Sequence, residues 1–370
     1  MAVGRGRGRH GSLFFLFRIP KSFMSFFRPN IVEMSGYVPG EQPQGGKLIK
    51  LNTNENPYVC SPKVKVAIGR AVQAGLQKYP DPAATAFRMR AGELFGCDPD
   101  WILCGNGSDD ILTIVTRALV DSGDHVRFSQ PSYTLYRTLA EIQGAQCHIV
   151  DYQADWALGA DFTKPCDQLR LAYLANPNSP SGTLVPPEEV LRIAEVLPCP
   201  LLVDEAYTDF AETNCLELVA QNEKIMVSRT LSKSYALAGL RFGFLIAQPQ
   251  VISELNKVRD SYNCDAISIA GATAAIDDQN WLTQNRGAIL ATRSRLIDQL
   301  RQLGFDCVDS QANFVWCNHP KHGAKGLYEQ LKSDGVLVRY MNYAGWGDGL
   351  RITVGSDEQI DALLAVLGGY

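Results

Sequence analysis

The chain has 370 residues, of which 46% are hydrophobic and 20% are charged, as in ordinary globular proteins. A chain of this length exceeds a single minimal core, so we expect two domains. Its 35 basic and 39 acidic residues leave a net charge of −4, and no apolar run is long enough to span a membrane. These features argue against a nucleic-acid-binding protein and against a membrane protein.

The first 30 residues are basic and aromatic, and the first acidic residue is Glu33. One interpretation is an organelle transit peptide. The preferred one is a prefix upstream of a true start at Met24 or Met34, because SGYVPGEQPQGGKLIKLNTNENPY is typical of the beginning of a mature enzyme. We assign residues 1–46 to an N-terminal extension and arm, and leave residues 1–30 out of the fold prediction.

From residue 47 onward, helical patterns alternate with short β-type runs. Helices are predicted at 61–76, 81–96 and 108–123, and β-type runs at 124–129, 146–150, 171–176, 200–207, 224–230 and 242–247. Such interleaving predicts βαβ units, so the expected fold class is α/β, with a mostly parallel sheet sandwiched by helices. We assign residues 47–262 to this large domain.

After residue 262 the pattern changes. It predicts a long helix over 280–303, β runs at 313–317, 335–341 and 350–355, a helix near 324–333 and a terminal helix. Strands mixed with helices over about a hundred residues indicate a smaller α+β domain, residues 263–370.

Ten cysteines are scattered singly between Cys60 and Cys317, with no C-x-x-C pair and no histidine at metal-ligand spacing. Several of them stand in apolar runs, where a reduced thiol behaves as a small hydrophobe. We therefore expect a reducing, cytoplasmic compartment and no metal site.

Ligands of open α/β sheets bind beyond the carboxyl ends of the strands, so the residues that follow each strand are the candidates. After WILC comes GNGSDD, whose glycines and helix N-terminus suit a phosphate; the alternative is a plain turn capped by Ser108 or Asp109. Tyr133 follows the next strand, either as a packing residue or as a ring that stacks on a flat ligand. The turn NPNSPSG (176–182) is either a surface turn or a source of hydrogen bonds.

Asp204 follows four apolar residues, where a buried carboxylate is costly unless a cation or a strong donor meets it; the alternative is a loop cap. Lys233 stands among small residues in RTLSKSYALAGLRFGF, and a lysine shielded from water can form a Schiff base with a carbonyl. A phosphate cradle, a stacking ring, a buried carboxylate, a reactive lysine and Arg241 together describe a site for pyridoxal 5′-phosphate.

The motifs LNTNENPY, KYPD, GNGSDD, QPSYTLY, NPNSPSG, VDEAYTDF, RTLSKSYALAGLRFGF, NFVW and LRITVG cover nearly all of the chain after the prefix. The chain resembles fold-type-I pyridoxal-phosphate aminotransferases, and most closely histidinol-phosphate aminotransferases. The resemblance implies that Lys233 binds the cofactor and then acts as acid and base. It also implies that Asp204 pairs with the pyridine nitrogen, that Tyr207 bonds the ring hydroxyl and that Tyr133 stacks on the ring.

The resemblance further implies that the cofactor phosphate contacts the amides of Ser108 and Asp109, the Ser232 hydroxyl and Arg241. Tyr79, in KYPD, would reach the phosphate of the neighbouring subunit's site, which implies an obligate homodimer.

One position departs from the family pattern. Where NPNNPTG has an asparagine that bonds the ring hydroxyl, this chain has Ser179. Asn176 or Asn178 could take over that bond.

Two arginines are implied in substrate binding. Arg351 would bind the α-carboxylate of glutamate and 2-oxoglutarate, and Arg339 would bind the phosphate of histidinol phosphate. An exposed strand arginine is the alternative for Arg339. A further substrate-binding asparagine is expected at position 55. The implied reaction converts histidinol phosphate and 2-oxoglutarate into imidazole-acetol phosphate and glutamate, a step of histidine biosynthesis.

Other functions remain open from the sequence. An aromatic-amino-acid aminotransferase and a threonine-phosphate decarboxylase share these motifs. A cofactor-binding transcription regulator is disfavoured because the prefix is too short for a DNA-binding module, and a non-catalytic scaffold because every ionisable group that the chemistry requires is present.

Overall fold

The computed structural model describes residues 26–36, 40–42 and 48–369. Most of the basic prefix and the alternative start at Met24 lie outside the described residues. Among the helices that are described, none is both long and apolar enough to cross a membrane.

The short helix α1 (Pro29–Glu33) lies against the end of α5 (Leu135–Gln143). Arg28 Nη2 donates to the carbonyl of Ile142 at 2.8 Å, and Asn30 Nδ2 donates to the carbonyl of Glu141 at 2.7 Å. Residues 28–30 were left out of the sequence-based fold prediction, yet they pack on the fold.

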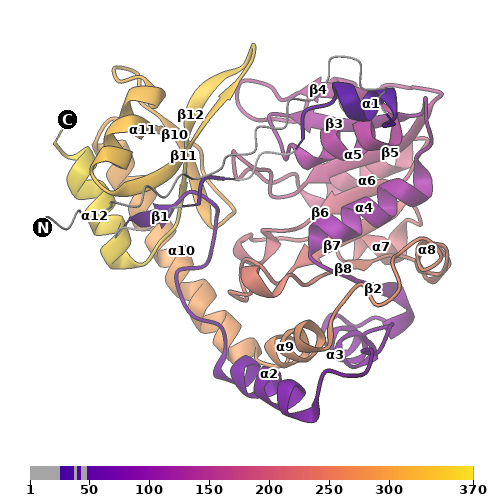
Figure 1. Cartoon of the computed structure of the whole chain (residues 1–370). Helices are drawn as coiled ribbons and strands as arrows, with labels where there is room; N and C mark the ends of the chain where they lie inside the picture. Colours follow the sequence, from indigo (N-terminus) through magenta and orange to yellow (C-terminus); the bar gives the residue numbers. More distant parts are fainter. Residues whose placement is uncertain (1–25, 37–39, 43–47, 370) are drawn as a thin grey trace, which may run out of the picture.

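Two β-sheets, each with its own helices, form the molecule (Figure 1). The larger sheet has seven strands in the order β2-β8-β7-β6-β5-β3-β4. Their bounds are β2 Ile102–Gly105, β3 His125–Gln130, β4 Gln146–Asp151, β5 Leu169–Ala175, β6 Leu201–Asp204, β7 Ile225–Thr230 and β8 Gly243–Ile246. All neighbours are parallel except the two pairs that involve β8. The predicted α/β class with a mostly parallel sheet is confirmed.

Helices cover both faces of this sheet. One face packs against α4 (Ser108–Leu119), α5 and α8 (Pro249–Leu255). The other face packs against α2 (Pro62–Ala74), α3 (Thr85–Phe95), α6 (Pro187–Val196), α7 (Leu218–Gln221) and α9 (Ala266–Ile276). Both faces are therefore buried, which explains why every residue of β6 and of β7 is buried rather than every second one.

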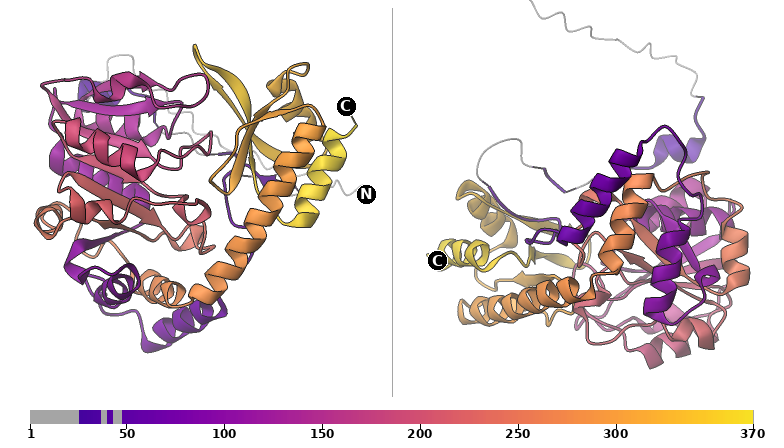
Figure 2. Two further views of the ribbon diagram at one scale, coloured as in Figure 1. Left: turned by 180° about the vertical axis from the view of Figure 1, so that it is seen from behind. Right: turned by 90° about the horizontal axis from the view of Figure 1, so that it is seen from below.

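The smaller sheet has five strands in the order β1-β11-β12-β10-β9. The bounds are β1 Ile49–Leu51, β9 Asp306–Cys307, β10 Phe314–Asn318, β11 Val336–Tyr343 and β12 Gly347–Thr353. The helices α10 (Gln279–Gln302), α11 (Ala324–Ser333) and α12 (Asp357–Leu367) share its core. Figure 2 shows α10 and α12 side by side on its outer face.

The two cores do not divide at the predicted position. β1, assigned to the large domain from the sequence, pairs in parallel with β11 of the smaller sheet. Conversely, α9 lies in the core of the larger sheet, and the change of core falls within α10, between Leu282 and Ile289. Because α10 takes part in both cores, the packing gives no single residue at which the domains divide, and the domain boundary near residue 262 stays a prediction.

Helix ends follow local chemistry. Ser61 caps α2 by accepting a hydrogen bond from the Lys63 amide, with Pro62 in the first turn. Helix α3 ends at Gly96 and α5 at Gly144, both left-handed residues where a side chain would be strained.

Candidate functional site

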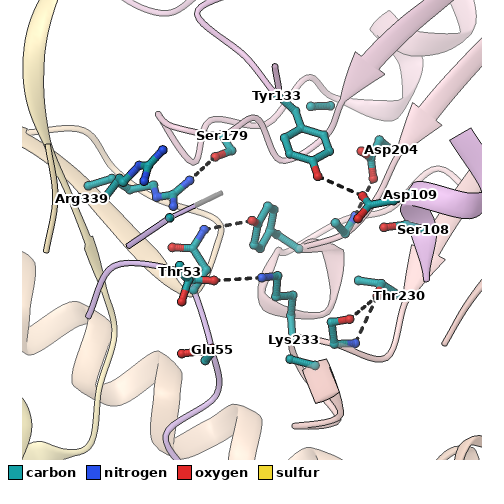
Figure 3. A pocket seen from close by; sticks show the side chains of 18 of the residues that line it. Thr53, Glu55, Ser108, Asp109, Tyr133, Ser179, Asp204, Thr230, Lys233 and Arg339 are labelled. Carbon is teal, nitrogen blue, oxygen red and sulfur yellow. Dashed lines mark hydrogen bonds between the residues drawn. The ribbon is translucent and has the colours of Figure 1, made fainter. Parts of the chain in front are cut away.

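A cavity of about 260 Å³ opens at the carboxyl ends of the larger sheet's strands and faces the smaller sheet (Figure 3). The residues predicted from the sequence that line it are Ser108, Asp109, Tyr133, Ser179, Asp204, Tyr207, Ser232, Lys233, Arg241, Arg339 and Arg351. Asn176, Asn178 and Tyr79 are not among the described residues that line it. The cavity therefore lies where ligands of α/β sheets are expected, beyond the strand ends, but three residues that were assigned to the site do not line it.

Lys233 lies in the turn after β7 and points into the cavity. Its Nζ donates to the carbonyl of Thr53 at 3.1 Å and lies 5.7 Å from the centre of the Tyr207 ring. Thr53 follows β1, so the smaller sheet's edge strand helps to orient the amine. A half-buried primary amine held in this way is placed to attack a carbonyl carbon in the cavity.

Asp204 ends β6 and is 5% exposed. Its carboxylate accepts hydrogen bonds from Tyr136 Oη at 2.8 Å and from Ser228 Oγ and the Ala206 amide at 3.3 Å each. Burial raises the pKa of this carboxyl to about 6. No lysine or arginine in the described part of the chain forms an ion pair with it. A buried carboxylate whose hydrogen-bond donors are all neutral, facing a cavity, fits a cationic group of a ligand.

Tyr136 was missed as a site residue. It is fully buried in α5, its ring stacks on Tyr173 at 4.6 Å, and burial next to Asp204 raises its pKa well above the ordinary value. The motif QPSYTLY contains it: Tyr136 lies in the first turn of α5, three positions after Tyr133, and the two rings meet edge-on with their centres 5.7 Å apart.

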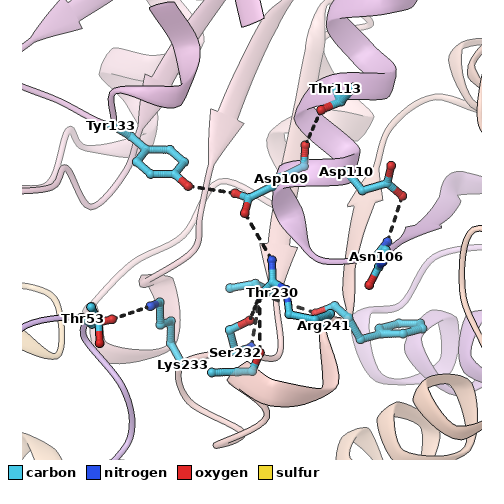
Figure 4. A network of polar contacts seen from close by, with 12 residues as sticks. Thr53, Asn106, Asp109, Asp110, Thr113, Tyr133, Thr230, Ser232, Lys233 and Arg241 are labelled. Carbon is cyan, nitrogen blue, oxygen red and sulfur yellow. Dashed lines mark hydrogen bonds and ion pairs between the residues drawn. The ribbon is translucent and has the colours of Figure 1, made fainter. Parts of the chain in front are cut away.

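A cradle for an anion lies beside Asp204, around the start of α4 (Figure 4). Arg241 Nη2 pairs with Asp109 Oδ2 at 3.2 Å, and its Nη1 donates to Ser232 Oγ at 3.4 Å. Gly107 precedes the helix with φ +89°, and a Cβ there would lie 2.6 Å from Arg241 Nη2. The first amides of a helix, including those of Ser108 and Asp109, have no partner within the helix and point toward such a cradle.

Two tyrosines border the space between Lys233 and Asp204. Tyr133 Oη donates to Asp109 Oδ1 at 2.9 Å, and Asn54 Nδ2 donates to Tyr207 Oη at 2.9 Å. The ring of Tyr207 meets Phe314 edge-on, with centres 4.9 Å apart. Both hydroxyls are thus held in place; stacking of Tyr133 on a bound ring stays a prediction.

The assignment of Asn176 and Asn178 to the cofactor is wrong for this structure. Asn176 closes its own loop, donating to the carbonyl of Val185 at 2.9 Å and accepting from its amide at 2.8 Å. Asn178 donates to Pro131 O and Ser181 Oγ and accepts from Ser132 Oγ. Both side-chain amides form hydrogen bonds within the turn and to the loops beside it. Neither therefore takes the place of the family's asparagine, at whose position this chain has Ser179.

Arg351 and Arg339 are register partners on neighbouring strands β12 and β11, and both line the cavity. Arg351 Nη1 donates to Ser179 Oγ at 2.9 Å and its Nη2 to the carbonyl of Asn52 at 3.0 Å. Ser179 therefore contacts Arg351 in this structure. Two guanidinium groups side by side give the smaller sheet's wall of the cavity a strong preference for anions.

Position 55 carries a glutamate, so the asparagine contact expected there is wrong. Glu55 forms an ion pair with Lys50, and Lys50 Nζ also donates to Thr53 Oγ1 at 2.8 Å. The asparagine that reaches a predicted catalytic residue is Asn54, through Tyr207. The motif LNTNENPY pointed to this segment but did not single out the residue.

Tyr79 lies away from the cavity of its own chain. It is 80% exposed, and its ring stacks on Tyr262 at 4.5 Å. An exposed tyrosine supported by a second ring is compatible with a contact to another molecule, as the dimer prediction requires.

The fold and the cavity define an α/β protein with a reactive amine, a buried carboxylate and an anion cradle at the strand ends. The model of the family aminotransferase class I and II matches residues 46–367, and the chain belongs to this family. Histidinol-phosphate aminotransferase of Rhodopirellula baltica is 53% identical over 342 residues, 92% of this chain and 94% of that protein. Histidinol-phosphate aminotransferase 1 of Nostoc is 45% identical over 93% of this chain and 97% of that protein.

Among solved structures, histidinol-phosphate aminotransferase from Sinorhizobium meliloti in complex with pyridoxal-5′-phosphate superposes with a TM-score of 0.82. It is 27% identical, and the match covers 94% of this chain and 99% of that one. Similarity therefore extends over both sheets and the cavity between them.

Proposed function

We propose that the chain is a pyridoxal-phosphate-dependent transaminase that moves the amino group of histidinol phosphate to 2-oxoglutarate, giving imidazole-acetol phosphate and glutamate. The observation that carries the proposal is the placement of Lys233, Asp204 and the Arg339–Arg351 pair around one cavity. The 53% identity to a histidinol-phosphate aminotransferase over nearly the whole chain supports the choice of substrate.

The residues present fit this cofactor. Asp204 lacks a cationic partner in the described chain, which a protonated ring nitrogen would supply. The phosphate would be held by Arg241, Ser232 and the amides that begin α4. Gly107 has no Cβ, so the space next to the Arg241 guanidinium is open to the anion. Lys233 would hold the aldehyde carbon.

When bound, pyridoxal phosphate supplies an aldehyde and an electron-accepting ring. Once the substrate amine has replaced Lys233 at the aldehyde carbon, the freed Lys233 Nζ would take a proton from the substrate α-carbon and deliver it to the carbon that carried the aldehyde. The Asp204 carboxylate would stabilise positive charge at the ring nitrogen, and Tyr207 Oη, held by Asn54, would orient the ring hydroxyl. Because the first product leaves before the second substrate binds, we expect ping-pong kinetics.

The two arginines divide the recognition of the substrates. Arg351 would bind the carboxylate of glutamate and 2-oxoglutarate in a two-bond fork, and its bond to Ser179 sets the plane of that fork. Arg339 would bind the phosphate of histidinol phosphate. Because the two strand positions are direct neighbours, one cavity can serve both substrates in turn.

We further propose a homodimer in which Tyr79 reaches the partner's cofactor phosphate, and a cytoplasmic enzyme. The exposure of Tyr79 outside its own cavity supports the first point. The ten free thiols, none of which is in a disulfide, are compatible with the second.

The test is a panel of amino donors offered with 2-oxoglutarate: histidinol phosphate, phenylalanine, tyrosine and threonine phosphate. We expect histidinol phosphate to have the highest kcat/KM. Arg339→Ala should lower that value by on the order of 10- to 100-fold, because a charged hydrogen bond is lost. Phenylalanine and tyrosine should change little, and exposed Arg192→Ala is the matched control.

Lys233→Ala should remain folded and lose steady-state turnover with every donor. Turnover in this variant would contradict the catalytic assignment. A preference for phenylalanine or tyrosine would instead indicate an aromatic-amino-acid aminotransferase, and release of CO2 from threonine phosphate without transamination would indicate a decarboxylase.

A further inference from the structure

We propose that His125, His148 and Cys166 form a binding site for a divalent transition-metal ion of the Zn²⁺ type. Their potential ligand atoms all lie within 4.8 Å of one another, and all three residues are half-buried. They are far apart in sequence, which is why the spacing of cysteines and histidines gave no hint of a metal site.

The sheet brings the three residues together. His125 begins β3, His148 lies on the neighbouring parallel strand β4, and Cys166 precedes β5 on the other side of β3. Arg127 is the register partner of His148, and His125 lies two residues before Arg127 and hence on the same face. The cluster is at the amino-terminal end of β3, whereas the catalytic cavity lies beyond the carboxyl ends, so the two sites are separate.

The donor atoms are close to the separation that zinc requires. Zn–S and Zn–N bonds of about 2.3 and 2.0 Å place sulfur and nitrogen about 3.5 Å apart in a tetrahedral site. Cys166 Sγ lies 3.2 Å from His125 Nδ1. The third ligand atom lies within 4.8 Å of the other two, so it needs to move inward by at most roughly 1.5 Å, and water can supply a fourth ligand because the residues are only half-buried.

His148 is in a form that can coordinate a metal. Arg127 Nη2 lies 3.0 Å from His148 Nδ1, and a guanidinium can only donate, so this nitrogen carries a lone pair. Coordination would replace this bond, while Arg127 Nη1 keeps its bond to the carbonyl of Phe162. The thiol proton of Cys166 would pass to solvent.

Arg127 is the charged group nearest to the three residues. It is 0% exposed, its Nε has no hydrogen-bond partner, and no carboxylate of the described chain pairs with it. The thiolate offsets only one of the two positive charges of Zn²⁺, so Arg127 lowers the affinity of the site. It lowers the affinity for every divalent cation alike, so the thiolate and imidazole donors decide the choice in favour of Zn²⁺ over Mg²⁺ or Ca²⁺.

The experiment is equilibrium dialysis of the holoenzyme against Zn²⁺ in excess Mg²⁺, with metal content measured by mass spectrometry. We expect one zinc per chain that X-ray absorption shows with one sulfur and two nitrogen ligands. Cys166→Ser and His148→Asn should each weaken zinc binding by on the order of tenfold or more. Cys97→Ser, at a half-buried cysteine elsewhere, should keep it.

Thermal unfolding provides a second measurement that does not depend on activity. Zinc should raise the Tm of the wild type and of Cys97→Ser, but not of Cys166→Ser, because a ligand that binds the folded state stabilises it. The variants should retain transamination, which shows that they are folded. Equal zinc content in the wild type and Cys166→Ser, or a zinc without sulfur ligation, would overturn the proposal.

Discussion

The carboxylate of Asp204 is buried, and burial disfavours its charged form. Burial raises its pKa from the ordinary value of 3.8 to about 6, and its hydrogen-bond donors are all neutral. Below pH 3.8 the group is protonated in both the folded and unfolded states. Between pH 3.8 and about 6 the folded state keeps the proton that the unfolded state has lost. The free energy of unfolding therefore falls as the pH rises over this range, and the loss is complete once the pH has passed about 6.

Asp204→Asn should therefore stabilise the cofactor-free protein. A difference of two pKa units corresponds to about 3 kcal/mol, reached at pH 8 and shrinking toward pH 4. Urea unfolding of both proteins without cofactor at pH 8 and pH 5 measures the effect. With cofactor, the same variant should lose activity, because an amide does not hold the ring nitrogen protonated. A variant that is no more stable than the wild type at pH 8 would contradict the interpretation of the buried charge.

The predicted residues that the structure brings to the cavity include several that stand at strand ends; their roles stay predictions. Lys233, Asp204 and Arg241 come directly after buried strands or before one, and parallel topology brings such positions to one edge. The cofactor role expected for Asn176 or Asn178 was not predictable in this way, because the hydrogen-bond partner of a side-chain amide depends on how the loop closes. In the structure, Asn176 donates to Val185 O and Asn178 donates to Pro131 O. Composition of a turn does not contain that information.

At the scale of elements, the start of α4 controls the anion cradle. Gly107 has φ +89°, a conformation that disfavours other residues, and an added Cβ would meet Arg241. Gly107→Ala should therefore strain the turn by roughly 1–3 kcal/mol and displace the guanidinium that would hold the phosphate. We expect weaker cofactor binding in a protein that still folds, measured as faster loss of the cofactor's absorbance during dialysis.

Gly239→Ala is the matched control for this prediction. A Cβ at Gly239, only two residues from Arg241, would meet nothing within 4 Å, and no left-handed φ is required there. Cofactor retention should match the wild type. Equal loss in both variants would mean that the segment tolerates no side chain, and the specific clash with Arg241 would then not be the cause.

Elements were predictable where their pattern is local and were missed where the partner is distant. The apolar runs of β5, β6 and β7 and the amphipathic pattern of α4 were visible in the sequence. β1 has three residues and exists because β11, almost three hundred residues later, pairs with it. The direction of β8, antiparallel to both neighbours, likewise depends on the turn at Lys233 rather than on its own residues.

At the scale of the whole molecule, the cavity needs both sheets. The larger sheet contributes Lys233, Asp204 and Arg241, which would hold the cofactor, and the smaller sheet contributes Arg339 and Arg351, which would bind the substrates. An aromatic cluster joins them beside the cavity: Trp346 Nε1 donates to the carbonyl of Tyr152 at 3.4 Å, and the rings of Trp156 and Trp346 are 4.0 Å apart. This contact adds to those that hold the two sheets, and with them Lys233 and the arginines, around the cavity.

In the proposed homodimer, the partner subunit would contribute to the cavity as well. Tyr79 is exposed, and so are the apolar side chains of Val66 and Val72 in α2 and of Leu76 just after this helix. An apolar surface beside an exposed tyrosine is typical of a subunit interface. Tyr79→Phe should leave the dimer intact in sedimentation and weaken cofactor binding by on the order of 10- to 100-fold, because only a hydrogen bond to a charged phosphate is lost.

Mixed dimers decide whether Tyr79 acts across the interface. Lys233→Ala chains supply an intact Tyr79, and Tyr79→Phe chains supply an intact Lys233, so a mixed dimer has one complete site if the tyrosine reaches the partner. At a cofactor concentration that leaves Tyr79→Phe dimers mostly empty, unfolding and refolding the two variants together should restore activity that neither has by itself. If Tyr79 served its own chain, each Lys233 would remain paired with the phenylalanine, and mixing would restore nothing.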